Sequence, residues 1–277
     1  MSVEITPQKI KELRGRTGVG VSKCKEALAE ASGDIEEAIN YLRKTGLASA
    51  VKKAGREANE GKIVTAQTDD CVALVEIGAE TDFVANNEQF VEFAKNVAEE
   101  AAKTKPSSVE EFSAAKFSKD PSMTIEEYRG TLVQAIGENI QIKRLMVFDK
   151  ESKKSIGIYS HMGGKIVTVV EMIGGSEELA KDVAMHAAAA APDFLSPDTV
   201  PDSIIEQEKD VARGQLAGKP EHIMDKILDG KINAFYDDVC LLRQKYIKDD
   251  SMSVADYVKS KNADAAVTNF VRWSVGE

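Results

Sequence analysis

Three segments of this sequence combine glycine with lysine, the residue types that could cradle a phosphate group. A phosphate loop requires four residues between its two glycines, a Ser or Thr after its lysine, and a helix that starts behind it. The segment "GREANEGKI" has five residues between Gly55 and Gly61, and the segments "GGKIV" and "GKP" have no Ser or Thr after the lysine. The first two also lead into strand patterns. We therefore predict that this chain binds no nucleotide.

The histidines and cysteines offer no catalytic or metal-binding pattern either. His161, His186 and His222 have no His, Cys or carboxylate companions at the spacing of metal ligands. His186 lies on an apolar helical stripe, which predicts a histidine packed in the core, whereas His161, in the turn "YSHMGGK", is expected to be exposed. Its purpose there is either contact with a partner or filling the turn. No Ser or Cys lies beside a plausible base, so we expect no metal, no cofactor and no enzymatic activity.

One aromatic residue, Phe83, stands at a corner that water usually reaches. The segment "ALVEIGAETDFVANNEQFVEFA" begins with a strand pattern and continues from Glu88 with a helical pattern. Phe83 lies between the two patterns. From the residues alone it either packs under its own fold, for example against Phe90, or is held out for a partner.

The composition excludes several classes of protein. A hydrophobic content of 43% is typical of a globular chain, and no apolar run approaches the ~20 residues that span a bilayer. The net charge of −10 argues against a broad nucleic-acid surface, because phosphates would be repelled. Residues 1–56 carry +4 and the remainder −14, which marks the N-terminal segment as a separate module. Three distant cysteines and a start without a signal peptide predict reduced thiols and a cytoplasmic protein.

Residues 1–54 are predicted to form a module of three short helices. Thr6 followed by Pro7 is typical of a helix start. Ser22 is predicted to cap the second helix after the glycine-rich turn "RTGVGVS", and Asp34 is predicted to cap the third. A core this small is marginal, so we expect the module to dock on another surface.

The pattern after residue 55 predicts an α+β core with two subdomains, at 55–149 and 150–277. In the first subdomain a helix begins near Glu88, and Thr124 with Glu127 is predicted to cap a further helix. Its strands are predicted at 62–67, 72–77 and 140–148. The order strand, strand, helix repeats in "SIGIYSHMGGKIVTVVEMIGGSEELAKDVAMHAAAAA", which we interpret as an internal duplication with antiparallel sheets. The second copy lacks the Asp-Phe element, so the shared fold does not require it.

A different element is predicted at about 201–248. Apolar residues at helical spacing on both sides of "GKP" (218–220) predict two long helices in an antiparallel hairpin, the second extending to Leu242. The last residues predict a short helix and a final strand that returns to the second sheet.

Several motifs together resemble those of one protein family. They occur in the order "LRGRTGVGVSKCKEALAEASGDIEEAINYLRKTG", "ETDFVANNEQF", "IGENIQIKRL", "VAMHAAAAAPDFL" and "GKPEHIMDKILDGKINAFYDDVCLLRQ". This order resembles the translation elongation factor Ts family over essentially the whole chain. The resemblance implies a ubiquitin-associated-like N-terminal module, a duplicated two-subdomain core and a coiled-coil hairpin.

The resemblance also implies a function and a partner. Members of this family are guanine-nucleotide exchange factors for elongation factor Tu, a GTPase that carries aminoacyl-tRNA to the ribosome. A chain of this kind would bind elongation factor Tu with GDP, promote GDP release and allow GTP to bind. It would contact neither nucleic acid nor membrane directly. The alternative, from another class, is an adaptor or chaperone-like protein that binds a GTPase without changing its nucleotide kinetics.

The site that the resemblance implies is the element Thr81-Asp82-Phe83-Val84. Matched by motif, it is the element that disturbs the Mg²⁺ site of elongation factor Tu, with Phe83 as the side chain that enters the partner. Asp82 either adds repulsion near the partner's phosphates or orders the corner as a helix cap; the cap is slightly favoured, because Asp commonly plays that part.

Two further contacts follow from the resemblance. The N-terminal module would touch the partner's nucleotide domain through Arg14 and the turn that contains Gly18, Val21 and Ser22. His161, in the second subdomain, would contact another domain of the partner. Family members often carry two Met where this chain has Val21-Ser22.

Overall fold

The computed structural model describes residues 5–215 and 221–277. The turn predicted at 218–220 lies outside the described residues. The chain divides into two compact units, and each is described by itself. The first runs to Lys150 and includes Gly163–Lys165 and Ser274–Glu277; the second comprises Glu151–Met162 and Ile166–Trp273.

The first unit begins with three helices around a small apolar core. These helices are α1 (Pro7–Thr17), α2 (Val21–Glu30) and α3 (Ile35–Lys53). Thr6 caps α1 as predicted, because its hydroxyl accepts a hydrogen bond from the Lys9 N–H at 3.3 Å. Asp34 likewise caps α3 and accepts from the Glu37 N–H at 2.8 Å. Buried apolar side chains from all three helices form the centre of the cluster, among them Leu13, Leu28 and Leu42.

The predicted cap at Ser22 is wrong. Helix α2 starts at Val21, with Gly20 in the cap position and no side-chain hydrogen bond there. Gly18 adopts a left-handed conformation (φ 70°) that ends α1, and the chain needs only Val19 and an extended Gly20 to enter the next helix. Ser22 therefore lies exposed in the first turn of α2 rather than in front of it.

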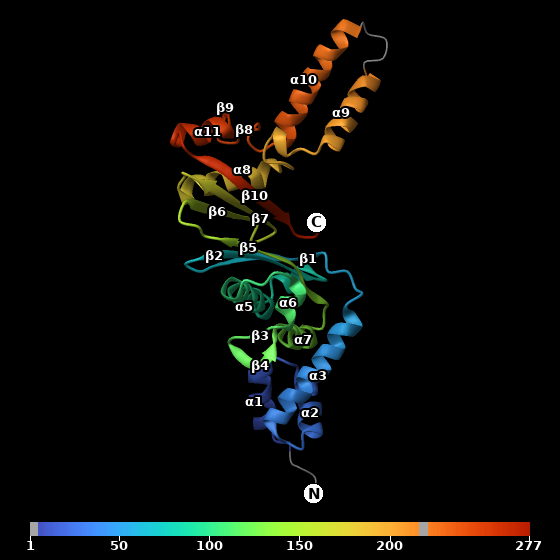
Figure 1. Ribbon diagram of the computed structural model, residues 1–277. Helices are drawn as coiled ribbons and strands as arrows, with labels where there is room; N and C mark the ends of the chain where they lie inside the picture. The colour runs from blue at the N-terminus through green and yellow to red at the C-terminus, as the bar shows by residue number, and fades with distance from the viewer. Residues whose placement is uncertain (1–4, 216–220) are drawn as a thin grey trace. The chain divides into compact units, whose positions relative to one another are not determined.

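An antiparallel sheet and the helices on one side of it form the main core of the first unit. Its strands lie in the order β1 (Glu60–Gln67), β2 (Cys71–Ala79) and β5 (Ile140–Asp149). Helices α5 (Glu88–Thr104), α6 (Val109–Ala114) and α7 (Ile125–Ile136) cover it (Figure 1). The central strand β2 is buried over its whole length, and every second residue joins the helices in one apolar cluster. The positions concerned are Cys71, Ala73, Val75, Ile77 and Ala79.

Helix α3 packs on α7 where two glycines face each other. A Cβ atom added to Gly46 would lie 2.9 Å from the carbonyl oxygen of Gly130, which leaves no room for a side chain. Close by, the Arg43 guanidinium forms an ion pair with Asp120 at 3.1 Å. The three N-terminal helices are thus held against the rest of the first unit, as a module with so small a core requires.

The second unit repeats the sheet topology of the first. Its strands β6 (Lys154–His161), β7 (Ile166–Ile173) and β10 (Ala266–Ser274) lie in the order β10-β7-β6, with β6 and β7 antiparallel, and α8 (Glu177–Ala190) covers one face (Figure 1). In both units, the second strand along the chain is central and the last strand pairs with it. The final strand returns to the second sheet, as predicted.

The structural repeat also includes a small hairpin and the helix after it. In the first unit, β3 (Lys116–Phe117) and β4 (Asp120–Thr124) precede α7; in the second, β8 (Lys245–Tyr246) and β9 (Asp249–Ser253) precede α11 (Val254–Lys261). Both hairpins use the same register, and both following helices begin with a complete capping box, at Thr124 and at Ser253. The internal duplication is confirmed and is longer than the sequence pattern indicated.

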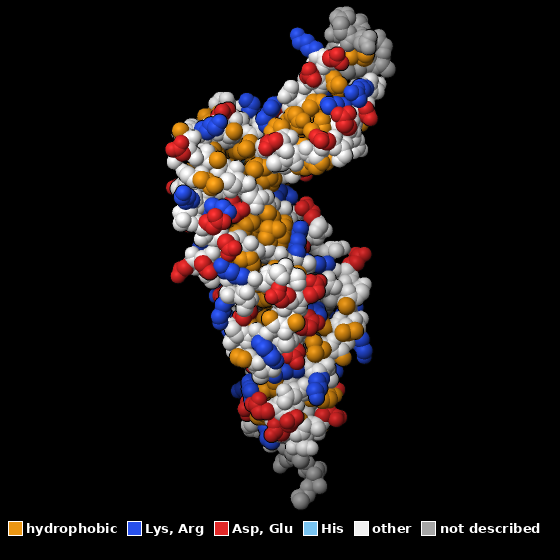
Figure 2. Space-filling model, in the orientation of Figure 1, with side chains coloured by type: hydrophobic (Ala, Val, Ile, Leu, Met, Phe, Trp, Pro, Cys, Tyr) orange, Lys and Arg blue, Asp and Glu red, His pale blue; other side chains and the backbone are white. Residues whose placement is uncertain are grey.

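Helices α9 (Asp202–Gln215) and α10 (Glu221–Val239) form the hairpin of the second unit, after the short 3-10 helix η1 (Pro197–Thr199). Hydrophobic side chains gather on the face of this hairpin that Figure 2 shows. The prediction that the second helix extends to Leu242 is wrong. Beyond Val239 the backbone turns to pair with an earlier segment, since the Leu241 N–H donates to the Phe194 carbonyl at 2.8 Å and the Leu242 N–H to the Leu195 carbonyl at 3.0 Å.

The described residues therefore form an α+β fold with antiparallel sheets, as the sequence predicts. Within 5–215 and 221–277, the structure contains no helix with the length and apolar character needed to cross a bilayer.

Candidate partner-binding site

A four-residue helix, α4 (Asp82–Ala85), lies between the central strand β2 and the long helix α5. Thr81 is the last extended residue before it (φ −132°, ψ 155°), and its hydroxyl accepts a hydrogen bond from the Val84 N–H at 3.3 Å. Asn87 then caps α5 by accepting from the Gln89 N–H at 2.9 Å. Two helix starts in close succession thus fix the path of the chain around this corner.

The predicted cap at Asp82 is wrong, because Thr81 occupies the cap position. Asp82 is the first residue of α4 and its side chain is exposed to solvent. The N–H group that the cap satisfies, that of Val84, donates to the Thr81 hydroxyl. The charge of Asp82 is therefore not used in the cap.

Phe83 points out of the fold. Its side chain is 85% exposed, whereas the next two residues, Val84 and Ala85, are 9% and 1% exposed and join the apolar core. Successive helix residues are turned by ~100° about the axis, so burying positions 84 and 85 leaves position 83 facing water. Phe90 is fully buried in the apolar core, and Phe83 is not a member of that cluster. The interpretation in which Phe83 packs against Phe90 is therefore wrong.

Two carboxylates hold the strand end that leads into α4. Glu138 accepts from both donors of Thr81, the backbone N–H at 3.1 Å and the hydroxyl at 2.8 Å. Glu80 accepts from the Asn139 N–H at 2.6 Å and forms an ion pair with Arg56 at 3.3 Å. The segment between α7 and β5 is therefore tied to the segment between β2 and α4 through side chains of both.

The turn between α1 and α2 lies beside the start of α5. A Cβ atom added to Gly18 would come within 2.3 Å of the Gln89 side-chain nitrogen. A hollow of about 290 Å³ lies here, lined by residues of α1, α5 and α7. The structure thus brings Gly18 close to the helix that directly follows the Phe83 corner.

The remaining predicted contact residues of the N-terminal module face solvent. Arg14 lies on α1 and Ser22 on α2, both exposed, and Val21, the first residue of α2, is 49% exposed.

His161 ends strand β6 in the second unit and is exposed, as predicted. Its ring stacks on Tyr159 with centroids 6.2 Å apart. The following residue, Met162, has a left-handed conformation (φ 49°) and a side chain that is 72% exposed. The two side chains form a small exposed surface at this turn.

His186 is a core residue, as predicted. Its Nδ1 accepts from the Ile247 N–H at 3.1 Å, so the proton must be on Nε2, which donates to the Gln244 side-chain oxygen at 3.0 Å. Burial lowers the pKa of His186. The ring is thus a neutral structural link between α8 and the segment before β9.

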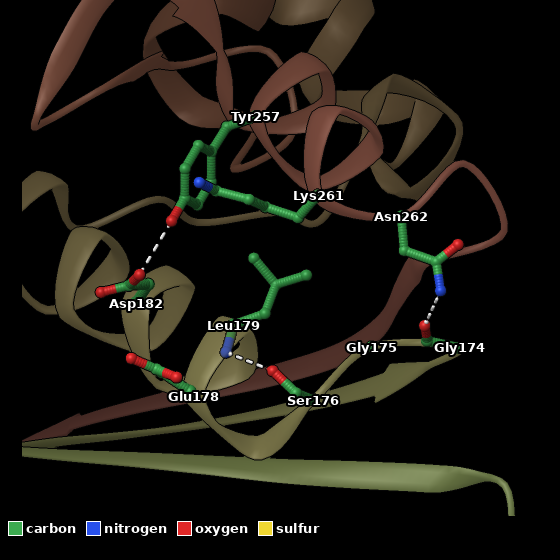
Figure 3. A pocket seen from close by; sticks show the side chains of 9 residues that line it. All are labelled: Gly174, Gly175, Ser176, Glu178, Leu179, Asp182, Tyr257, Lys261 and Asn262. Atoms are coloured by element: carbon green, nitrogen blue, oxygen red, sulfur yellow. Dashed lines mark hydrogen bonds between the residues drawn. The ribbon is translucent and has the colours of Figure 1, made fainter.

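A hollow of about 410 Å³ in the second unit lies between α8 and α11 (Figure 3). Several of its polar groups are used within the fold: the Tyr257 hydroxyl donates to Asp182 at 2.8 Å, and Ser176 caps α8 by accepting from the Leu179 N–H at 3.1 Å. Burial, followed by the neighbouring Tyr246 and Asp182, raises the pKa of Tyr257. Of the hydrogen bonds that Figure 3 shows, the one between Tyr257 and Asp182 joins α11 to α8, and the one between Asn262 and Gly174 joins the end of α11 to the turn after β7.

Cysteine thiols and clusters of metal-binding side chains are the other kinds of group that could be chemically reactive in this fold. Cys24, Cys71 and Cys240 are free and buried, and burial raises the pKa of the Cys24 and Cys240 thiols, which keeps them protonated. In the part of the chain that the structure describes, no group of three or more His, Cys, Asp or Glu side chains could hold a metal ion.

Comparison with known proteins identifies the family. A family model described as "Elongation factor TS" matches residues 80–277. A protein named Elongation factor Ts from Protochlamydia amoebophila (strain UWE25) is 59% identical over 279 residues, which cover 99% of each chain. The chain belongs to the elongation factor Ts family. Proteins of the same name from Chlamydia pneumoniae and Chlamydia muridarum (strain MoPn / Nigg) are 44% and 42% identical, again over 99% of each chain.

Membership of the elongation factor Ts family makes the chain a translation elongation factor, which confirms the resemblance seen in its motifs. Reasoning from the sequence missed Glu138 and Glu80 at the site. The segment "IGENIQIKRL" that contains Glu138 carries no local signal for this contact, because Thr81 is 57 residues away. Only the folded chain brings the two together.

Proposed function

We propose that this chain is a guanine-nucleotide exchange factor for elongation factor Tu. It binds the GTPase in its GDP form, disturbs the site that holds Mg²⁺ and the phosphates, and so promotes GDP release and GTP binding. The observation that carries the proposal is the Phe83 side chain, 85% exposed on a capped helix whose next two residues are buried. Membership of the elongation factor Ts family supports the same partner.

The mechanism requires only that the factor bind the nucleotide-free GTPase better than the nucleotide-bound one. By linkage, nucleotide then weakens the binding of the factor by the same ratio. Phe83 acts as a wedge that gains its burial only in the partner. Burying a phenylalanine is worth ~1.5–3 kcal/mol, which is enough to accelerate release roughly tenfold to a hundredfold at 1.4 kcal/mol per tenfold.

The neighbours of Phe83 have separate parts in this mechanism. Thr81 and Val84 set the direction of α4, since one caps it and the other anchors it in the core. Asp82, which is exposed and not the cap, adds a negative charge that repels the phosphates of the bound nucleotide.

Two other surfaces hold the partner. Arg14, Gly18, Val21 and Ser22 of the N-terminal module contact its nucleotide domain, and His161 contacts another of its domains. This arrangement corresponds to a division of the chain into 1–54, 55–149 and 150–277, in which the first part is a ubiquitin-associated-like module used to bind the GTPase.

The proposal is tested with Phe83→Ala and a stopped-flow trace of fluorescent GDP leaving elongation factor Tu. Because Phe83 is exposed, the substitution should change the stability of the free factor by less than ~0.5 kcal/mol, while release slows roughly tenfold to a hundredfold. Val51→Ala is the matched control: this residue is 74% exposed on α3 and its truncation should leave the rate unchanged.

The outcome separates exchange factor from adaptor. If the chain is an adaptor, even the unaltered protein will bind elongation factor Tu without accelerating GDP release. Full activity of Phe83→Ala would remove Phe83 from the mechanism while leaving exchange itself in place.

A further inference from the structure

The orientation of Phe83 depends on a side chain that lies outside the segment 81–84. Phe83, at 85% exposure, makes too little contact with its own fold to fix its direction, and α4 is only one turn long. A single turn of helix is unstable without other contacts. The orientation of Phe83 must therefore come from the residues that anchor the two ends of α4.

Glu138 anchors the N-terminal end through both polar groups of the cap residue. One carboxylate oxygen accepts from the Thr81 N–H and the other from the Thr81 hydroxyl, at 3.1 and 2.8 Å. Since the hydroxyl donates its only proton to Glu138, its lone pair is left to accept from the Val84 N–H. The carboxylate thus sets the rotamer in which Thr81 can cap α4.

Glu138 is itself firmly placed. Gly137 ends α7 in a left-handed conformation (φ 95°), with its N–H bonded to the Val133 carbonyl at 2.9 Å. On the other side, Asn139 is fully buried; its N–H donates to Glu80 and its side-chain amide to the Arg56 carbonyl at 2.8 Å. The carboxylate is therefore presented from a rigid connection between α7 and β5.

We infer that Glu138 is the positioning residue for nucleotide release: it holds the Thr81 cap so that Phe83 is presented to the partner in its working direction. The inference rests on the proposed function. Glu138 acts through Thr81 and need not touch elongation factor Tu. The gain comes from preorganisation, since a turn that is already ordered loses less conformational freedom when it binds.

Glu138→Gln is the appropriate variant because it keeps the shape of the side chain. A glutamine offers one oxygen and an NH₂ group, so only one of the two Thr81 donors finds an acceptor. We expect GDP release to slow about tenfold, equivalent to ~1.4 kcal/mol. Thr81→Val removes the hydroxyl from the other side of the same bond and should slow release to a similar extent.

A double-mutant cycle with Phe83→Ala distinguishes positioning from a general structural effect. If Glu138 acts through Phe83, Glu138→Gln slows release in the unaltered chain but has little further effect when Phe83 is already Ala. A slowing of equal size in both backgrounds would show that Glu138 acts independently of Phe83 and would overturn the inference.

Glu111→Gln serves as the matched control. Glu111, in α6, also accepts from the N–H, at 2.9 Å, and the hydroxyl of a single residue, but through one carboxylate oxygen, and that residue, Ser107, lies in the loop before the helix. This variant should release GDP at the rate of the unaltered chain.

The same measurements separate failure of the inference from failure of the function. If Phe83→Ala slows release and Glu138→Gln does not, the proposed function stands and the inference is wrong. If Phe83→Ala leaves the rate unchanged, the wedge itself is wrong, and the inference falls with it.

Discussion

The packing of α3 on α7 can be tested at Gly46, where the two backbones meet. A Cβ atom at this position would lie 2.9 Å from the Gly130 carbonyl oxygen, 3.0 Å from its carbonyl carbon and 3.2 Å from the Thr131 nitrogen. All three are backbone atoms, which cannot rotate aside as the end of a long side chain can. Gly46→Ala therefore requires the helices to move apart.

Two opposing terms determine the size of the effect. Overpacking of a tight contact costs ~1–3 kcal/mol, whereas replacing Gly by Ala inside a helix gains ~1 kcal/mol. The net loss of folding free energy at Gly46 is then up to about 2 kcal/mol. At Gly130 the nearest atom to an added Cβ, the Leu47 nitrogen, is 3.1 Å away, so Gly130→Ala should cost less than Gly46→Ala.

Gly15, inside α1, provides the matched control, because nothing lies within 4 Å of a Cβ added there. Gly15→Ala should show the helix-propensity gain alone. In a thermal melt, at ~2–4 °C per kcal/mol, Gly15→Ala should raise the midpoint by a few degrees while Gly46→Ala lowers it. If Gly46→Ala raised the midpoint as much as Gly15→Ala does, the two helices would not be in close contact in solution, and the docking of the N-terminal module would have to be rejected.

Two further predictions concern stability. Burial lowers the pKa of His186, so below its ordinary value of ~6.5 the unfolded chain binds a proton before the folded one. The free energy of unfolding should therefore decrease as the pH is lowered from about 6.5 through the pKa of the folded state. Urea titrations between about pH 5 and 7.5 should show a weaker pH dependence of this free energy for His186→Gln than for the unaltered chain. Equal pH dependence in the two proteins would contradict this reasoning. Thr124→Ala and Ser253→Ala each remove a capping box from corresponding helices and should each cost ~0.5–2 kcal/mol of unfolding free energy; a neutral result at both would show that these caps contribute nothing.

Local sequence patterns predicted the elements whose stability is local. Alternating apolar residues located β2, and the capping signals at Thr6 and Thr124 located the starts of α1 and α7. The pattern failed where an element spans only about one period of its own repeat. Helix α4 has four residues, too few for helical spacing to emerge, and the two-residue strands β3 and β8 have no alternation to detect.

The remaining features depend on contacts between distant parts of the chain. Whether Phe83 is buried or exposed follows from which residues of α4 meet the core, and neighbouring residues in the sequence are compatible with both. The contact of Glu138 with Thr81, and that of Gly46 with Gly130, join residues far apart in the sequence. No propensity or spacing rule describes such pairs before the fold is known.

The duplication shows which part of the site the fold does not need. In the second unit, β7 ends at Ile173, two glycines follow, and Ser176 caps α8 directly. In the first unit, the same connection between central strand and long helix contains α4 as an additional element. Two sheets of the same strand order thus exist with and without it. An apolar side chain held in water costs solvation free energy, and the second copy shows that the architecture folds without that cost, which supports the proposal that Phe83 is kept exposed for a partner.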